Sequence, residues 1–275
     1  LQKDFEEIGM KKKTALITGA SAGIGAAFCE FLAARGYDLI LCARRRERLE
    51  KLAADLEQQY SIEAVVLVKD LAKKEAPEEI FRDLSERGIQ VDFLVNNAGY
   101  SMKSSFCESS REEVDDFFNV MSVSVTRLCH LALLGMKENG YGRIINVASI
   151  AAFAPESPGS LYTPVKRYML SLSKALSLEV SELDIQVTAL CPGFTYTEFH
   201  DVLGNREKMN RLPKFLWMDS EPVVHAGYDA VMSGKAVCVP GLVNKLIALL
   251  CSFVPHSWLL ALGPKVLVGK KQRKG

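Results

Sequence analysis

The sequence has almost no net charge, because 34 lysines and arginines offset 33 aspartates and glutamates over 275 residues. A whole-molecule field of this size gives no attraction to a polyanion, so we do not expect a nucleic-acid-binding protein. Long apolar runs are also lacking, and none reaches the ~18 uninterrupted residues of a membrane-spanning helix. In the nearest candidate, residues 242–254, Asn244 and Lys245 interrupt the run and Pro255 ends it.

Paired cysteine motifs are missing as well. The seven cysteines are odd in number and irregularly spaced, and no Cys-x-x-Cys occurs. Several lie in apolar, strand-like runs, as reduced core cysteines do. Residues 1–13 are charged and lack the apolar core of a signal peptide. We therefore expect a cytoplasmic protein with neither a disulfide framework nor a zinc site.

What the sequence does contain is a regular alternation of apolar strand-like runs and helical segments. We expect strands at residues 14–18, 38–43, 64–68, 93–95, 143–147, 186–191 and 237–239. We expect helices at residues 26–35, 45–60, 77–87, 110–139, 164–182 and 221–233. Repeated units of this kind predict an α/β fold, a doubly wound parallel sheet with helices on both faces. No linker or low-complexity segment interrupts residues 1–275, so we expect a single domain.

A glycine turn joins the first expected strand to the first expected helix. Gly19, Gly23 and Gly25 allow tight turning and close backbone approach, and the helix N-terminus attracts phosphates. The strand before the turn and the helix after it favour a dinucleotide site. Ser21 and Ile24 belong to the same turn and are assigned to the same site. The alternative is a βα turn that binds nothing.

The end of the second expected strand indicates which dinucleotide would bind. A site for NAD usually has an acid here for the ribose 2′-hydroxyl, but this chain has Ala43 followed by Arg44, Arg45 and Arg46. Guanidinium groups suit a 2′-phosphate, so we predict NADP, with Arg44 in contact with that phosphate. For Arg45 and Arg46 the solvated start of the next helix is an equal alternative.

Two further strand ends are assigned to the cofactor site. Asp70 ends the third strand, where its carboxylate could accept the adenine amino group or could cap a helix, and Leu71 follows it. Asn97, Ala98 and Gly99 follow the fourth strand, where small residues let the backbone approach a cofactor. Asn96 and Asn97 could equally be turn residues at the end of this strand.

Three residues suggest the chemistry. Tyr162 and Lys166 stand one helical turn apart, and Ser149 precedes the tyrosine at the end of a strand. A phenol has a reference pKa of ~10, and an ammonium group nearby should lower that pKa. A hydroxyl from Ser149 would hold a carbonyl oxygen against the phenol. The alternatives are a surface-helix tyrosine and a strand-end turn serine.

Together these motifs resemble the short-chain dehydrogenase/reductase family over nearly the whole chain. The matching pieces are residues 18–25, Asn96 to Gly99, Ser149, Tyr162-x-x-x-Lys166, and Cys191-Pro192-Gly193 followed by Thr197. The resemblance implies a Rossmann-type single domain, NAD(P) binding, and a homodimer or homotetramer. It implies that Tyr162 is the acid/base, that Lys166 binds the nicotinamide ribose, and that Ser149 holds the substrate carbonyl. It also implies that Pro192, Gly193 and Thr197 line the nicotinamide pocket.

The sequence departs from the family at one position. The family commonly has an asparagine in the long fourth helix that holds a proton-relay water, and that place falls on Met121. A thioether is only a weak acceptor and donates nothing. Asn119 lies two residues earlier, nearly on the opposite helix face, and could serve only if the helix bulges there.

Two segments bear on the substrate and on partners. Residues 194–220 form a variable loop, and its aromatic residues suit an apolar ketone or acyl chain or else pack the loop onto the core. We expect Phe194, Tyr196, Phe199, His200, Phe215, Leu216, Trp217 and Met218 in this loop, with Tyr100, Met102 and Phe153 facing the same cleft. Residues 242–275 are apolar and end in a basic stretch. We expect them to form helices that cover the cleft or a subunit interface. Contact with a membrane surface is the less favoured alternative.

Three functions are consistent with these residues. The first is an NADP-dependent oxidoreductase acting on an apolar carbonyl or alcohol. C-terminal segments like residues 242–275 also occur in family branches resembling 3-oxoacyl and steroid reductases, so a lipid-like substrate is one possibility. The second is a non-catalytic NADP-binding sensor or scaffold, for which Met121 leaves room. The third is an epimerase or dehydratase that uses the same tyrosine and lysine.

Overall fold

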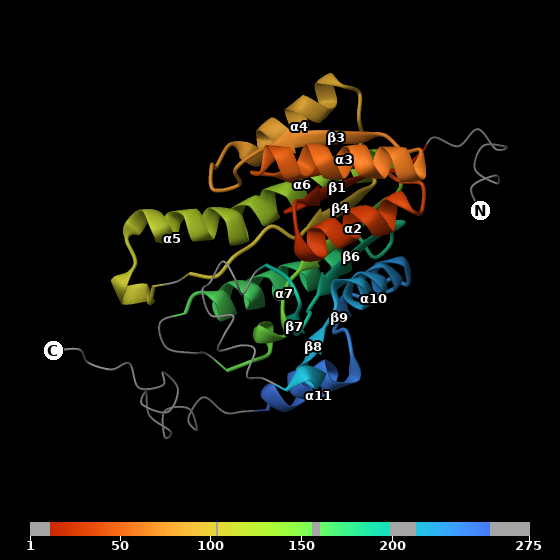
Figure 1. Ribbon diagram of the computed structural model, residues 1–275. Helices are drawn as coiled ribbons and strands as arrows, with labels where there is room; N and C mark the ends of the chain where they lie inside the picture. Colours follow the sequence, from red (N-terminus) through yellow and green to blue (C-terminus); the bar gives the residue numbers. More distant parts are fainter. Residues whose placement is uncertain (1–11, 103, 156–159, 199–212, 254–275) are drawn as a thin grey trace.

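A seven-stranded parallel sheet forms the centre of the computed structural model, which describes residues 12–102, 104–155, 160–198 and 213–253. The strand order is β3-β2-β1-β4-β5-β6-β9 (Figure 1). The strands are β1 (Thr14–Thr18), β2 (Asp38–Ala43), β3 (Ala64–Val68), β4 (Phe93–Asn96), β5 (Gly142–Val147), β6 (Ile185–Leu190) and β9 (Val237–Cys238). The expected doubly wound parallel sheet is confirmed, with β9 at its edge as predicted.

Helices cover both faces of the sheet (Figure 1). On one face lie α2 (Gly23–Ala33), α3 (Arg46–Tyr60) and α10 (Ser220–Met232). On the other lie α4 (Ala76–Glu86), α5 (Arg111–Phe118), α6 (Ser124–Asn139) and α7 (Tyr162–Glu179). Shorter elements are η1 (Phe106–Glu108), η2 (Asn119–Val123), η3 (Ile150–Ala152), η4 (Lys214–Leu216), β7 (Phe194–Thr195), β8 (Trp217–Met218) and α11 (Leu242–Cys251). The first helix begins earlier than expected because the last two glycines of the turn form its first residues.

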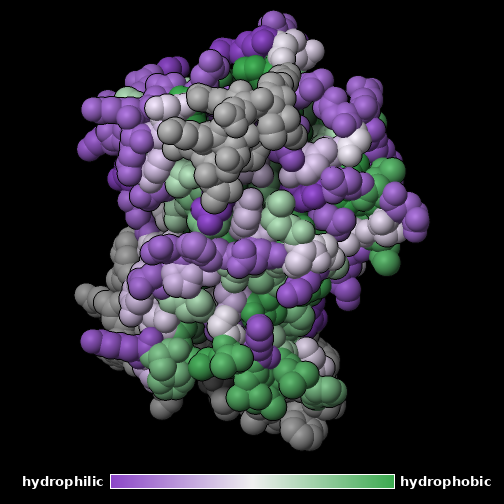
Figure 2. Space-filling view, turned by 90° about the vertical axis from the view of Figure 1, so that its right-hand side faces the viewer, coloured by the Kyte–Doolittle hydropathy of each residue, from purple (hydrophilic) through white to green (hydrophobic). Residues whose placement is uncertain are grey.

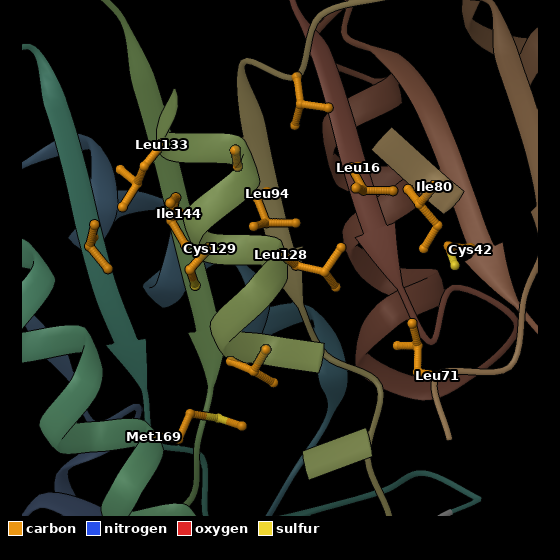
Figure 3. Close-up of a cluster of buried hydrophobic side chains, with 14 of the residues drawn as sticks. Leu16, Cys42, Leu71, Ile80, Leu94, Leu128, Cys129, Leu133, Ile144 and Met169 are labelled. Atoms are coloured by element: carbon orange, nitrogen blue, oxygen red, sulfur yellow. The ribbon is translucent and has the colours of Figure 1, made fainter. Parts of the chain in front are cut away.

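The central strands are buried on both faces, which explains their continuous apolar runs. Leu16 and Leu94 point to the α6 side of the sheet, where they pack with Leu128 and Cys129 (Figure 3). The next residue of β1, Ile17, faces the other layer and belongs to the cluster around α2. Alternate residues of one strand therefore fill two separate cores.

The long helix opposite the sheet contains an irregular turn. It begins at a capping box in which Ser110 accepts from the Glu113 N–H while the Glu113 carboxylate accepts from the Ser110 N–H. It runs through a π-helical segment, η2, into α6. Residues 111–139 are long and apolar enough to cross a membrane by length and composition, but 56% of the apolar window is buried in the fold. This helix packs on the sheet as a core element.

The strand order reverses between β1 and β4, and one hydroxyl fastens the two strand ends together. Thr18 is 1% exposed. Its Oγ1 donates to the Val95 carbonyl at 3.3 Å and accepts from the N–H groups of Asn97 at 3.0 Å and Ala98 at 3.1 Å. The Asn97 amide donates back to the Thr18 carbonyl at 3.0 Å and to the Gly19 carbonyl at 3.3 Å. These bonds hold the glycine turn against the end of β4, at the switch point where such folds bind ligands.

Replacement of Thr18 by valine tests this junction, because Thr18→Val keeps the shape and removes the hydroxyl. Each buried group left without its partner costs ~1–3 kcal/mol, so the free energy of unfolding should fall by ~2 kcal/mol or more. Denaturant unfolding measures this change. Thr188→Val is the matched control, because Thr188 is also fully buried but makes one side-chain bond, to the Lys235 carbonyl. A loss at Thr18 no larger than the loss at Thr188 would contradict the assignment.

Candidate active site

A cavity of about 720 Å³ opens at the carboxyl ends of β1, β2, β4 and β5. The residues assigned to the site from the sequence are almost all on its wall. They are Gly19, Ser21, Gly23, Ile24, Arg44, Asp70, Leu71, Asn97, Ala98, Gly99, Ser149, Tyr162, Lys166, Pro192, Gly193 and Thr197. The spacing of the motifs therefore brings one set of residues together around a single cavity.

The glycine turn has the shape that a pyrophosphate needs. Gly19 and Gly23 have φ values of +66° and +57°, which favour glycine. A Cβ at Gly19 would lie 2.7 Å from the Asn97 amide nitrogen, and one at Gly23 would lie 2.9 Å from the Thr197 side chain. Helix α2 begins immediately afterwards with no capping side chain and no acid in its first turn. Its first N–H groups are therefore oriented for an anionic ligand.

Gly25 differs from its neighbours because it is buried and does not line the cavity. A Cβ at this position would collide with the Gly19 carbonyl oxygen. The cofactor-binding role assigned to Gly25 therefore stays a prediction, and in this structure the residue packs beneath the turn. Its role is to let α2 pack closely beneath the turn.

The three arginines after β2 occupy different surroundings. Arg44 is exposed and lines the cavity. Arg45 donates to the Ser21 hydroxyl at 3.0 Å and pairs with Glu198 at 2.8 Å. Arg46 pairs with Glu50 one turn along α3 and does not line the cavity. Of the two alternatives for Arg46, its position agrees with a solvent-exposed residue at the start of the helix. Glu198 also pairs with Arg48, and these arginines lower the pKa of its carboxyl.

The ends of β3 and β4 form the next part of the wall. The Asp70 carboxylate accepts from the Ala72 N–H at 3.1 Å, so it caps the following turn while it also lines the cavity. Both alternatives raised for Asp70 are thus compatible with its position. Asn97 uses its amide to hold the glycine turn, so it acts as a positioning residue within the wall.

Tyr162, Lys166 and Ser149 meet at the other end of the cavity. Ser149 hydrogen-bonds the Tyr162 side chain, and its hydroxyl also accepts from the Ala151 N–H at 3.1 Å. The Lys166 ammonium is 5.6 Å from the centre of the tyrosine ring. It is 4% exposed and donates to the Val147 carbonyl at 2.7 Å. Helix α7 presents the tyrosine and the lysine on one face, and the end of β5 carries the serine.

The expected lowering of the phenol pKa by Lys166 is wrong for this structure. Loss of surrounding water raises the pKa of Tyr162 to about 12, and the hydrogen bond with Ser149 lowers it only in part. Burial also lowers the pKa of Lys166 to about 8, because the charged form loses its hydration. Burial is the largest cause of both shifts, and it favours the neutral form of each group.

The relay position is apolar in three dimensions too. Met121 is fully buried, lines the cavity, and accepts weakly from the Tyr100 N–H at 3.4 Å. The helix does bulge here, since η2 is a π-helical turn over Asn119–Val123. Even so, the Asn119 amide donates to the Ala72 carbonyl at 2.9 Å, and Asn119 is not among the lining residues. The bulge does not bring Asn119 into the site.

Sequence reasoning missed several residues that shape the cavity. Asn244 of α11 is buried and packs so closely on Gly193 that a Cβ there would overlap its amide. Ile247 and Cys251 of the same helix line the cavity. The sequence favoured helices over the cleft or a subunit interface at residues 242–275, but it did not indicate which side chains of α11 reach the cavity. Thr18 could have been found from its position immediately before the glycine turn.

The aromatic loop is divided between cavity and packing. Phe194 and Tyr100 line the cavity, whereas Tyr196 stacks on buried Trp217 with ring centres 4.8 Å apart. Phe215 is 68% exposed. Met102 and Phe153, expected to face the cleft, pack against the core instead. Leu216 and Met218 are partly buried outside the cavity wall. Phe199 and His200 lie outside the described residues.

Comparisons with known proteins agree with this site. The family model described as short chain dehydrogenase matches residues 13–208. The human protein named inactive hydroxysteroid dehydrogenase-like protein 1 is 28% identical over 92% of this chain and 75% of its own length. The 3-oxoacyl reductase FabG of Rickettsia conorii is 31% identical over 80% of this chain and 89% of its own length.

A solved structure extends the likeness to three dimensions. A short-chain dehydrogenase from Sphingobium yanoikuyae in complex with NADPH has a TM-score of 0.77 and 30% identity. The match covers 96% of this chain and 98% of that one. With the glycine turn, the Ser149, Tyr162 and Lys166 group, and the parallel sheet in place, the chain belongs to the short-chain dehydrogenase family of oxidoreductases.

Proposed function

We propose that this protein is an NADP-dependent oxidoreductase that reduces the carbonyl group of an apolar substrate. One observation carries the proposal: Ser149, Tyr162 and Lys166 line the same cavity as the glycine turn and Arg44. A proton donor and a dinucleotide cradle thus share one cavity. Membership of an oxidoreductase family supports the same reaction class.

Tyr162 is available as the proton donor, because burial keeps its phenol protonated, although the same burial makes the phenol a weaker acid. With its pKa raised to about 12, the phenol keeps its proton at neutral pH. Lys166, with a pKa of about 8, remains largely charged there and can stabilise the phenolate that proton donation leaves. A bound nicotinamide dinucleotide would supply the hydride for the carbonyl carbon. The carbonyl oxygen, held by the Ser149 hydroxyl, would take the proton of Tyr162, giving the alcohol.

The preference for NADP rests on the charge at the end of β2. Arg44 lies on the cavity wall, and Ala43 stands where an acid would otherwise bind the ribose 2′-hydroxyl. Arg45 contributes a second guanidinium on the wall beside Ser21. The NADPH complex of the Sphingobium protein supports this choice.

The substrate class follows from the remaining wall of the cavity. It is formed mainly by apolar side chains, among them Tyr100, Met121, Phe194 and Ile247. Such an apolar stretch of wall beside the catalytic residues suits a ketone or acyl chain better than a polyol. The names of relatives that are 3-oxoacyl reductases and hydroxysteroid dehydrogenase-like proteins agree with such a substrate.

Removal of the phenol hydroxyl tests the reaction. Tyr162→Phe should lower turnover of NADPH with an accepted ketone by about 10²–10⁴-fold, the usual contribution of positioned acid catalysis, while NADPH still binds. Absorbance of NADPH follows turnover, and its fluorescence follows binding. Tyr168→Phe is the control, because Tyr168 lies on the same helix, is 41% exposed and is not among the lining residues. Unchanged turnover in Tyr162→Phe would refute the mechanism.

Arg44 can be tested through cofactor choice. Arg44→Ala should weaken NADPH binding about ten- to a hundredfold, because a hydrogen bond to a charged group contributes ~1.5–3 kcal/mol. Binding of NADH, which lacks the 2′-phosphate, should change much less. Arg46→Ala removes an equal charge two residues away and should leave both affinities unchanged. An equal loss for both cofactors in Arg44→Ala would contradict the preference.

A second candidate function is a non-catalytic NADP-binding sensor or scaffold. It is favoured by Met121, which puts a buried thioether at the family's relay position. The printed name of the human relative, which describes that protein as inactive, points the same way. Tight NADPH binding with no NADPH oxidation across a panel of apolar ketones would favour this second function.

Replacement of Met121 measures how far the relay limits turnover. Met121→Asn places an amide on the cavity wall and should raise turnover of any accepted ketone by about tenfold or more, within the usual range of proton-transfer catalysis. Met121→Leu keeps an apolar side chain of similar volume and should turn over at the wild-type rate. If the asparagine variant is no faster than the leucine variant, the missing amide does not limit the reaction.

A further inference from the structure

Helix α11 has two faces with different surroundings. On one face Asn244 and Ala248 are buried, and Ile247 and Cys251 line the cavity. This face agrees with the expectation that a helix in residues 242–275 lies over the cleft. The opposite face is apolar, and its large side chains are 56–83% exposed. These are Leu242, Leu246, Leu249, Leu250 and Phe253, spaced so that they form one continuous stripe.

The stripe continues onto a neighbouring element. Phe215, 68% exposed, lies on η4, which contacts α11. Figure 2 shows hydrophobic side chains gathered at the lower end of the molecule, where Figure 1 places α11. Within the described part of the chain, no element covers these side chains. An apolar patch of this kind marks an interaction surface. We call Phe215 and the five side chains of the stripe the α11 patch.

The charge of the same region indicates what binds the patch. Residues 230–275 contain seven lysines and arginines and no aspartate or glutamate, although the whole chain has a net charge of only +1. The cations include Lys265, Lys270, Lys271, Arg273 and Lys274, among further apolar residues at 258–262 and 266–268. An apolar helix face next to a basic stretch is the combination that anionic lipid attracts.

Other occupants fit the patch less well. In a pair of copies both partners would carry the same excess of cations in residues 230–275, and like charges oppose association through this part of the chain. A nucleic acid would use the cations but would leave the leucine stripe exposed to water. An anionic lipid bilayer suits both kinds of group, because its interior is apolar and its headgroups carry negative charge.

We propose that the α11 patch docks on an anionic lipid surface, which also attracts the cationic sequence of residues 230–275. Because Ile247 and Cys251 on the inner face of α11 line the cavity, docking brings a wall of the cavity against the lipid. The proposal concerns the place where the protein binds and does not depend on whether the site is catalytic.

Sedimentation of the full chain with lipid vesicles tests the proposal. The protein should sediment with phosphatidylcholine–phosphatidylserine vesicles, less with phosphatidylcholine alone, and less as salt is raised. The double variant Leu246→Ser, Leu250→Ser should lose at least tenfold in partition. Leu178→Ser is the matched control, because Leu178 is a 76% exposed leucine on α7, outside the patch. It should partition as the wild type does.

Two further measurements keep the result unambiguous. Circular dichroism and NADPH binding report whether the double variant is folded. If it is not, Lys270→Gln with Lys271→Gln tests the charge independently and should reduce partition onto anionic vesicles only. A wild-type protein that stays in solution with both vesicles, or patch variants that sediment as the wild type does, would overturn the proposal. So would a dimer that the double variant dissociates without any vesicle binding, because the patch would then join two copies.

Discussion

The buried hydroxyl of Thr18 is the interaction on which the site depends. It links the end of β1 to the end of β4 through three hydrogen bonds, and the Asn97 amide returns two more. The chain leaves these two paired strands toward opposite faces of the sheet, into α2 after β1 and into α5 after β4, so these bonds join the two connections at the switch point. With the turn fixed, the N-terminus of α2 and the side chains of Arg44 and Arg45 face one cavity. The cofactor cradle is thus a consequence of the sheet topology.

At the other end of the cavity, burial controls the chemistry. Lys166 and Tyr162 are one helical turn apart, yet the loss of water around each group is the largest cause of the shift in its pKa. The phenol therefore holds its proton, and the ammonium is stabilised by the Val147 carbonyl. The site in this state holds a protonated phenol beside a buried ammonium group. The apolar wall beside it, which includes Met121, extends the same low-polarity surroundings to the substrate.

Much of this could be predicted from the sequence, since the ends of parallel strands converge at one edge of the sheet. The alternation of strands and helices gave the fold class, and the motif spacing placed Ser149, Tyr162 and the glycine turn around one cavity. What could not be predicted depends on tertiary contacts. The packing of Asn244 on Gly193, the pairing of Arg45 with Glu198, and the direction of the phenol pKa shift all arise between segments far apart in the chain. Gly25 shows that a motif does not distinguish a residue on the cavity wall from one packed beneath it.

The central claim is that one cavity holds a dinucleotide along its full length, from Arg44 to Tyr162. A crystal structure of the protein with NADPH tests this claim most directly. The account predicts the 2′-phosphate against Arg44, the pyrophosphate at the glycine turn, and the nicotinamide beside the Tyr162 hydroxyl. A dinucleotide bound outside this cavity, or one with its nicotinamide turned away from Tyr162, would contradict it.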